Sequence, residues 1–248
     1  MSSKISFFNK SVIRSDLKRL WWASALETLF LFLFFAFPIM DAISKGYQRY
    51  APDTAFRNSI IMSYGEASIM FAVIIPAALA IFLFSYLNSS KSVATMHGLP
   101  VKRSTFFFSH IASGIILFTL PFLINTAILL IFHAASSAEI TFRLMHLLMW
   151  TVMFLTYALL AFSGTTAVTM ITGSNVAALI LTGAIAVLPF LTEEFIYYFC
   201  QQQLYGYYGS TTCRVSDFLY VMPNQFWNGP YALIKYIIFA AILLAAAL

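Results

Sequence analysis

The stretch TFFFSHIASGIILFTLPFLINTAILLIF, residues 105–132, contains no lysine, arginine, aspartate or glutamate. About 20 apolar residues in an α-helix cross the roughly 30 Å of hydrocarbon in a bilayer. Because the bilayer offers backbone amides no water, such a run forms its hydrogen bonds within one helix. The stretch therefore predicts a transmembrane α-helix.

The whole chain has the composition of a membrane protein. Of its 248 residues, 61% are hydrophobic, 17% are aromatic and only 9% are charged, whereas about 25% of the residues in a soluble domain are charged. The mean hydropathy is +0.85. In such a chain the pI of about 9.2 reflects basic residues at the cytoplasmic ends of spans rather than nucleic-acid binding.

Five other runs are also long and apolar enough to cross a membrane. We therefore expect an all-α fold, an integral membrane bundle of six transmembrane helices in one domain over residues 1–248. Pro76 and Pro121 fall inside two of the runs, where each removes a backbone hydrogen bond and predicts a kink. The predicted spans are 21–41, 66–86, 105–132, 145–171, 175–193 and 230–248.

Lysine and arginine gather on the cytoplasmic side of membrane proteins. Five basic residues precede the first span, which places the N-terminus in the cytoplasm. Eight basic residues are then inside and five outside. The eight are Lys4, Lys10, Arg14, Lys18, Arg19, Lys91, Lys102 and Arg103, and the five are Lys45, Arg49, Arg57, Arg143 and Arg214.

Residues 5–20 differ from the spans. Their apolar residues fall near one helical face, and Lys10, Arg14 and Lys18 recur at every fourth position on another. That pattern predicts an amphipathic helix in the cytoplasmic headgroup layer. The alternative is a basic flank of the first span without a separate helix.

The connection between the second and third spans, residues 89–103, predicts a short cytoplasmic helix. Ser89 or Ser90 offers an N-cap, and Gly98 followed by Pro100 ends the helix. A short exposed helix with an apolar stripe and basic neighbours suits a groove on another protein. A capped membrane turn is the alternative. The predicted partner-binding residues are Val93, Met96, His97, Gly98, Leu99, Pro100, Lys102 and Arg103.

The run FSYLNSSKSVATMHGLPVKRSTFFFSHIASG, residues 84–114, resembles the membrane subunits of bacterial ATP-binding-cassette (ABC) exporters. The shared features are an aromatic-Ser-Tyr end of span two, a Ser-rich short helix, the turn of Leu99, Pro100 and Arg103, and a Phe-rich start of span three. The predicted N-terminal amphipathic helix and the long outer loop before span six extend the resemblance over the whole chain. The family has a basic tail after span six, and the AILLAAAL end of this chain leads us to expect a longer natural polypeptide.

The resemblance implies a permease subunit that pairs with a second permease half, identical or different. It also implies that residues 89–103 act as a coupling helix on a cytoplasmic ABC ATPase subunit. The chain itself has no G-x-x-x-x-G-K-[ST] and no G-x-G-x-x-G motif, so it has no phosphate-binding loop of these kinds. We therefore expect no cofactor and no ATPase activity in this chain, with ATP and Mg²⁺ bound by the partner ATPase.

The predicted extracytoplasmic loop, residues 194–229, is rich in tyrosine. Such aromatic density fits either an outer gate for an amphipathic substrate or a belt that only anchors the loop at the headgroups. Cys200 and Cys213 both fall in this loop, where an oxidising exterior would allow a disulfide.

Three acids are candidates for a translocation path: Glu27, Glu193 and Glu194. A carboxylate inside a span costs about 2.5–3.5 kcal/mol on insertion scales, so we expect Glu27 to face the bundle or to reach toward the interface. The alternative for all three is an ordinary acid near the end of a span. The four histidines show no H-E-x-x-H pattern and no i,i+4 pairing, so we predict no metal site.

These observations predict the membrane subunit of an ABC exporter in the bacterial cell membrane, which exports an amphipathic substrate such as a lipid, a peptide or a drug. A membrane anchor or sensor for a cytoplasmic partner is the first alternative. A secondary transporter is the second.

Overall fold

The computed structural model describes residues 8–44, 65–88, 103–135 and 144–204, together with residues 242 and 245. Every regular element within these ranges is a helix. The expected all-α class is therefore confirmed for this part of the chain.

The first element is a continuous helix that begins at the Asn9 cap. The Asn9 side chain accepts a hydrogen bond from the Ser11 N–H at 3.0 Å, which satisfies one free donor of the first turn. Helix α1 spans Lys10–Leu31 and continues through a π-helical segment, η1 (Phe32–Ala36), into α2 (Phe37–Ser44). A π-helical turn inserts one extra residue and is common at functional sites.

Four further long helices complete the described part. Helix α4 (Gly65–Phe84) ends in a 3₁₀ turn, η3 (Ser85–Asn88). Helix α6 spans Arg103–Ala135 and helix α7 spans Leu144–Ile171. Helix α8 (Asn175–Gln203) begins where the Ser174 hydroxyl accepts the Ala177 N–H at 3.1 Å.

Both internal prolines lie inside helices, Pro76 in α4 and Pro121 in α6. Each helix is unbroken through its proline. A proline leaves one carbonyl without its helical donor, and neighbouring polar side chains in a membrane bundle compensate. Close to Pro121, the Asn125 side chain donates to the Pro121 carbonyl at 2.9 Å.

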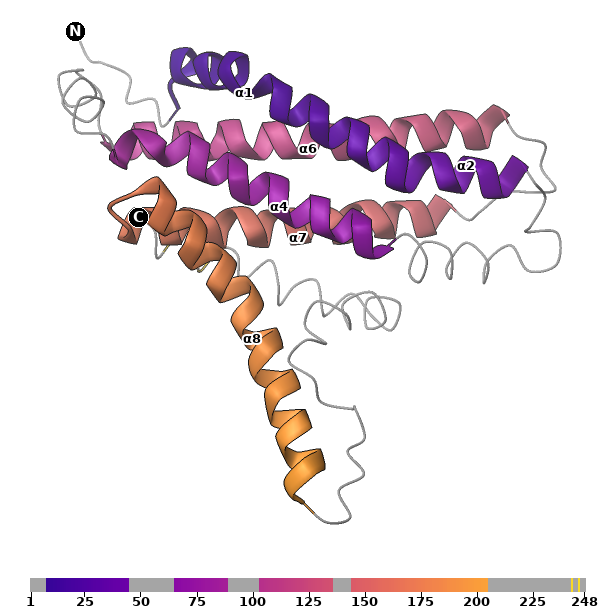
Figure 1. Cartoon of the computed structure of the whole chain (residues 1–248). Helices are drawn as coiled ribbons and strands as arrows, with labels where there is room; N and C mark the ends of the chain where they lie inside the picture. The colour runs from indigo at the N-terminus through magenta and orange to yellow at the C-terminus, as the bar shows by residue number, and fades with distance from the viewer. Residues whose placement is uncertain are drawn as a thin grey trace, which may run out of the picture.

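Side-chain contacts fix the direction of each helix in the bundle (Figure 1). Helices α1 and α6 run in the same direction, because Asp16 contacts His110 near their starts and Thr28 contacts Asn125 further along. Helix α4 runs the opposite way past α1, because Arg19 contacts Phe82 and Phe30 contacts Phe71. Helix α7 runs opposite to α6, since Phe118 contacts Phe162 and Thr126 contacts Thr151.

Four of these helical segments are long and apolar enough to cross a membrane, which supports a membrane-embedded protein. They are Lys10–Asp41, Phe71–Asn88, Arg103–Ala135 and Trp150–Ile171. The described apolar stretch of α8, Asn175–Ile185, is shorter. The sixth predicted span, 230–248, lies almost entirely outside the described residues, so the count of six stays a prediction.

The predicted amphipathic helix at residues 5–20 is not a separate element in the described residues. Helix α1 runs from Lys10 to Leu31 without interruption, so residues 10–20 continue directly into the first span. Asp16 and Leu20 on this part are buried, which shows that one face packs on the bundle. The interfacial helix at residues 5–20 therefore stays a prediction, with the basic flank of the first span as its alternative.

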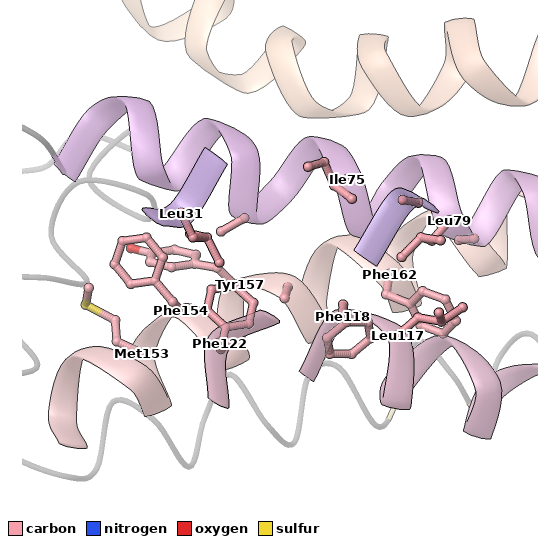
Figure 2. Packing of buried hydrophobic residues seen from close by; sticks show 14 of the residues in the cluster. Leu31, Ile75, Leu79, Leu117, Phe118, Phe122, Met153, Phe154, Tyr157 and Phe162 are labelled. Carbon is pink, nitrogen blue, oxygen red and sulfur yellow. The ribbon is translucent and has the colours of Figure 1, made fainter. Parts of the chain in front are cut away.

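Aromatic side chains fill the centre of the bundle (Figure 2). Phe35 of η1 stacks on Trp150 of α7, with ring centroids 3.5 Å apart and planes within 3°. Phe122 of α6 and Phe154 of α7 surround this pair. Such ring pairs contribute about 0.5–1.5 kcal/mol beyond their burial, so this cluster holds α6 and α7 against the end of the first helix.

Helix α8 leaves the bundle after its first turns and extends away from α4 and α7 (Figure 1). Ala178, near its start, is fully buried, whereas Leu188, Leu191 and Phe195 are more than half exposed within the described part of the chain. Apolar exposure of this kind suits a helix surrounded by lipid or by further protein.

Gly114 marks the closest approach between α6 and its neighbours. A Cβ atom built there would lie 2.4 Å from Phe162 Cζ and 3.0 Å from Leu83 Cδ1. Phe162 and Leu83 are both fully buried, so neither ring nor side chain has space to withdraw.

We expect Gly114→Ala to lower the free energy of unfolding by about 1–3 kcal/mol, because the added methyl group overpacks a filled site. The measurement is reversible unfolding in mixed detergent micelles followed by circular dichroism. Gly183→Ala on α8 is the matched control, since nothing lies within 4 Å of its added Cβ. Equal losses in the two variants would contradict the close packing at Gly114, and Phe162→Leu should restore part of the stability of Gly114→Ala.

Candidate functional site

Most of the predicted coupling helix lies outside the described residues. This applies to Val93, Met96, His97, Gly98, Leu99, Pro100 and Lys102. Arg103 is described, and it is the exposed first residue of α6. The structure describes the two helix ends that residues 89–102 connect. These are the end of η3 at Asn88 and the start of α6 at Arg103.

A polar cluster joins the helices at this end of the bundle. It consists of Asp16 and Arg19 of α1, the Phe82 carbonyl of α4, and Ser109 and His110 of α6. We call it the clamp. The first turns of α1, the last turns of α4 and the first turns of α6 all meet there.

The central contact of the clamp is between Asp16 and His110. Asp16 Oδ2 lies 2.6 Å from His110 Nδ1, and the exposed fractions of the two side chains are only 6% and 4%. A polar group removed from water costs free energy unless it is hydrogen-bonded. Each residue therefore supplies the partner that the other needs, and the contact ties α1 to α6.

Arg19 extends the clamp to the third helix. Its Nη2 atom lies 3.8 Å from Asp16 Oδ1 and donates a hydrogen bond to the Phe82 carbonyl at 3.2 Å. The Arg19 side chain is about half exposed, so water weakens the ion pair. The contact with Phe82 fixes the end of α4, three residues before η3.

The N-terminus of α1 is held by a further hydrogen bond. The Asn9 N–H donates to Ser109 Oγ at 2.9 Å, and Ser109 Oγ donates to the Thr105 carbonyl at 2.6 Å. The capping residue of α1 is thus attached to the second turn of α6, one residue before His110.

Three aromatic rings enclose the His110 imidazole. The ring centroids of Tyr86, Phe84 and Phe106 lie 5.0, 5.9 and 6.5 Å from the His110 centroid. His110 Nε2 is buried and has no hydrogen-bond partner among the described residues. Tyr86 belongs to η3, so the ring packing also links His110 to the turn that precedes residue 89.

The clamp can act as a mechanical link. A displacement at either end of the 89–102 connection moves η3 or α6, and the clamp passes that movement to α1. Rigid helices joined by discrete polar contacts are the elements through which coupling between sites travels.

Sequence reasoning missed Asp16 and His110 as a pair. Neither residue is among those predicted above for binding or transport, and His110 enters there only as a possible metal ligand. A signal existed: His110 is an ionisable residue within an apolar run, and such residues usually have a polar partner on another helix.

A second polar group lies further along α1. Glu27 is fully buried, and neither of its carboxylate oxygens has a hydrogen-bond partner among the described residues. The side chain therefore faces the bundle, one of the two placements expected. A basic group of a partner subunit has no access to it in this conformation.

The structure does not bring the three candidate path acids together. Glu193 and Glu194 lie in the distal half of α8, which extends away from the bundle that contains Glu27 (Figure 1). Cys200 is also on α8 and is partly exposed, and Cys213 lies outside the described residues. The translocation path and the disulfide both stay predictions.

No group of three or more histidine, cysteine, aspartate or glutamate side chains suited to a metal ion occurs among the residues that the structure describes. Asp16 and His110 form a pair only.

Comparison of the chain with protein-family models, with curated proteins and with solved structures finds no match in any of the three.

We expect Asp16→Ala to lower the free energy of unfolding by about 1–3 kcal/mol, because it leaves a buried imidazole without its hydrogen-bond partner. His110→Ala should cost a similar amount, and the double variant should cost much less than the sum. The measurement is a double-mutant cycle by unfolding in mixed micelles. Arg19→Ala is the control, with an expected loss of at most about 1 kcal/mol because its ion pair is half exposed. Additive losses for Asp16 and His110 would show that the two side chains do not interact.

Proposed function

We propose that this protein is the permease subunit of an ABC exporter. In this proposal a separate ATPase chain hydrolyses ATP, and the movement of that chain drives export of an amphipathic substrate such as a lipid, a peptide or a drug. A second permease subunit, identical or different, completes the path. The bacterial cell membrane is the proposed location, with the N-terminus in the cytoplasm.

The observation that carries the proposal is the place where the family-like segment joins the fold. The run of residues 84–114 resembles the coupling region of these exporters. Its two described ends, η3 and the start of α6, meet α1 at the clamp. A push on residues 89–103 would therefore reach α4, α6 and α1 together.

The proposed mechanism follows from this connection. ATP binding closes the partner ATPase dimer against the 89–103 segment. The force moves the ends of α4 and α6, and the Asp16–His110 contact carries α1 with them. The bundle then shifts as a unit against the second permease subunit, and access to the path between the subunits changes sides.

Charge reversal tests the coupling segment directly. We expect the double variant Lys102→Glu and Arg103→Glu to lose its binding to a co-expressed ABC ATPase subunit. Reversing two charges of the docking surface removes its electrostatic complementarity to the partner. The measurement is co-purification in detergent, together with ATP hydrolysis in liposomes. The matched control is Lys45→Glu with Arg49→Glu, two basic residues on the predicted outer side.

Loss of the ATPase in the first variant alone, with normal membrane insertion of both, supports the proposal. Normal co-purification of the ATPase with Lys102→Glu and Arg103→Glu would contradict it. Substrate flux in liposomes without any ATPase would favour the secondary transporter instead.

A further inference from the structure

The interface between α1 and α6 contains two buried side chains whose oxygen atoms have no hydrogen-bond donor among the described residues. Glu27 of α1 and Asn125 of α6 are both fully buried. Both carboxyl oxygens of Glu27 and the amide oxygen of Asn125 have no hydrogen-bond donor among the described residues. Buried acceptors in a membrane bundle normally have a hydrogen-bond donor. These three oxygens have none, so one additional O–H donor would improve the hydrogen bonding of the interface.

The two residues lie on the same stretch of the interface. The Asn125 amide nitrogen donates to the Thr28 carbonyl at 3.2 Å, and Thr28 is the next residue after Glu27. The contacts Asp16–His110 and Thr28–Asn125 enclose Glu27 between them along α1 and α6. Buried positions at Asp16, Leu20, Ala23, Glu27 and Leu31 form one continuous stripe on α1, so Glu27 and Asp16 share a face.

Among the residues that the structure describes, no basic group is paired with Glu27. The titratable and charged side chains on the described elements around it show no hydrogen bond or ion pair with its carboxyl group. On α1 and α2 these are Lys10, Arg14, Asp16, Lys18, Arg19 and Asp41; on η3, Tyr86; on α6, Arg103, His110 and His133; and on α7, Tyr157. His110, the cation candidate on the same interface, is already engaged by Asp16.

We propose that Glu27 is a proton-binding site within the membrane bundle, occupied when α1 and α6 are packed together as in this structure. A bound proton removes the charge, whose burial without a partner would be costly. It also converts one carboxyl oxygen into an O–H donor, in an interface where the Asn125 amide oxygen offers an acceptor. The ligand of the site is therefore H⁺, taken from water while the interface is open.

Helix α1 is followed, close to Glu27, by an irregular π-helical segment. The π-helical segment η1 begins at Phe32, five residues after Glu27, and a π-helical turn has fewer ideal backbone hydrogen bonds than the α-helix around it. Opening of α1 from α6 would expose Glu27 to water and release the proton. The packed interface should therefore weaken as the pH rises, because only the open form gives up the proton.

Infrared spectroscopy of the protein in liposomes tests the site, because the carbonyl stretch of a neutral carboxylic acid is separate from the amide bands. At neutral pH we expect a neutral-acid band in the unmodified protein that Glu27→Gln removes. Glu66→Gln, the same chemical change at the start of α4, is the control and should retain the band. Asn125→Leu should shift the band, because the O–H group loses its acceptor.

Each outcome decides the matter. The absence of a neutral-acid band at neutral pH overturns the proposal, and so does a band that survives Glu27→Gln. If Glu27→Gln fails to insert, Glu27→Asp keeps a carboxyl group in a shifted position, and an unchanged band in that variant counts against Glu27. A band unaffected by Asn125→Leu would remove Asn125 from the site. The proposal does not rest on the ABC assignment, since these spectra require no ATPase.

Discussion

One short contact, between Asp16 Oδ2 and His110 Nδ1 at 2.6 Å, sets the arrangement of the helix ends around it. The two groups are buried beside apolar rings, where water is not available to replace a lost partner. Neither residue can therefore move independently of the other without a large cost. Because α1 and α6 run in the same direction, fixing their first turns also fixes which faces meet along the rest of their length.

The same face of α1 presents two carboxyl groups in opposite situations. Asp16 has an imidazole and a guanidinium group near it, whereas Glu27, three turns further on, has no hydrogen-bond partner among the described residues. The difference follows from position. Asp16 lies near the end of the bundle, where His110 of α6 and Arg19 of α1 are within reach, and Glu27 lies deeper in the bundle, where no basic side chain of the described residues contacts it. A buried carboxyl group without a partner, such as Glu27, is stabilised by binding a proton. A carboxyl group beside basic side chains, such as Asp16, is stabilised by those side chains.

Hydropathy was sufficient to locate most of the helices. The predicted spans 66–86, 105–132 and 145–171 correspond to Gly65–Phe84, Arg103–Ala135 and Leu144–Ile171, because the length of an apolar run is a local property that the bilayer requires. Helix α8 continues to Gln203, ten residues past its predicted end at 193. There the acids Glu193 and Glu194 interrupted the apolar run without interrupting the helix.

The pairing of side chains was beyond sequence reasoning for a different reason. Asp16 and His110 are 94 positions apart in the chain, and only the packing of α1 on α6 makes them neighbours. The π-helical segment at Phe32–Ala36 also left no mark in the composition, and its Phe35 ring stacks on Trp150, which is far away in the sequence. Local sequence determines where the helices form. Contacts between residues far apart in the chain determine which side chains are paired.

These elements together give α1 a particular role. Its start is held by Asn9, Asp16 and Arg19 at the end of the bundle that receives residues 89–102. Its middle carries Glu27, and Phe35 within the π-helical turn η1 packs it against α7. A movement introduced at the clamp and travelling along α1 would reach Glu27 before it reached this turn. Glu27 lies between the clamp and that turn, so it is placed where a shift of α1 would first open the interface with α6.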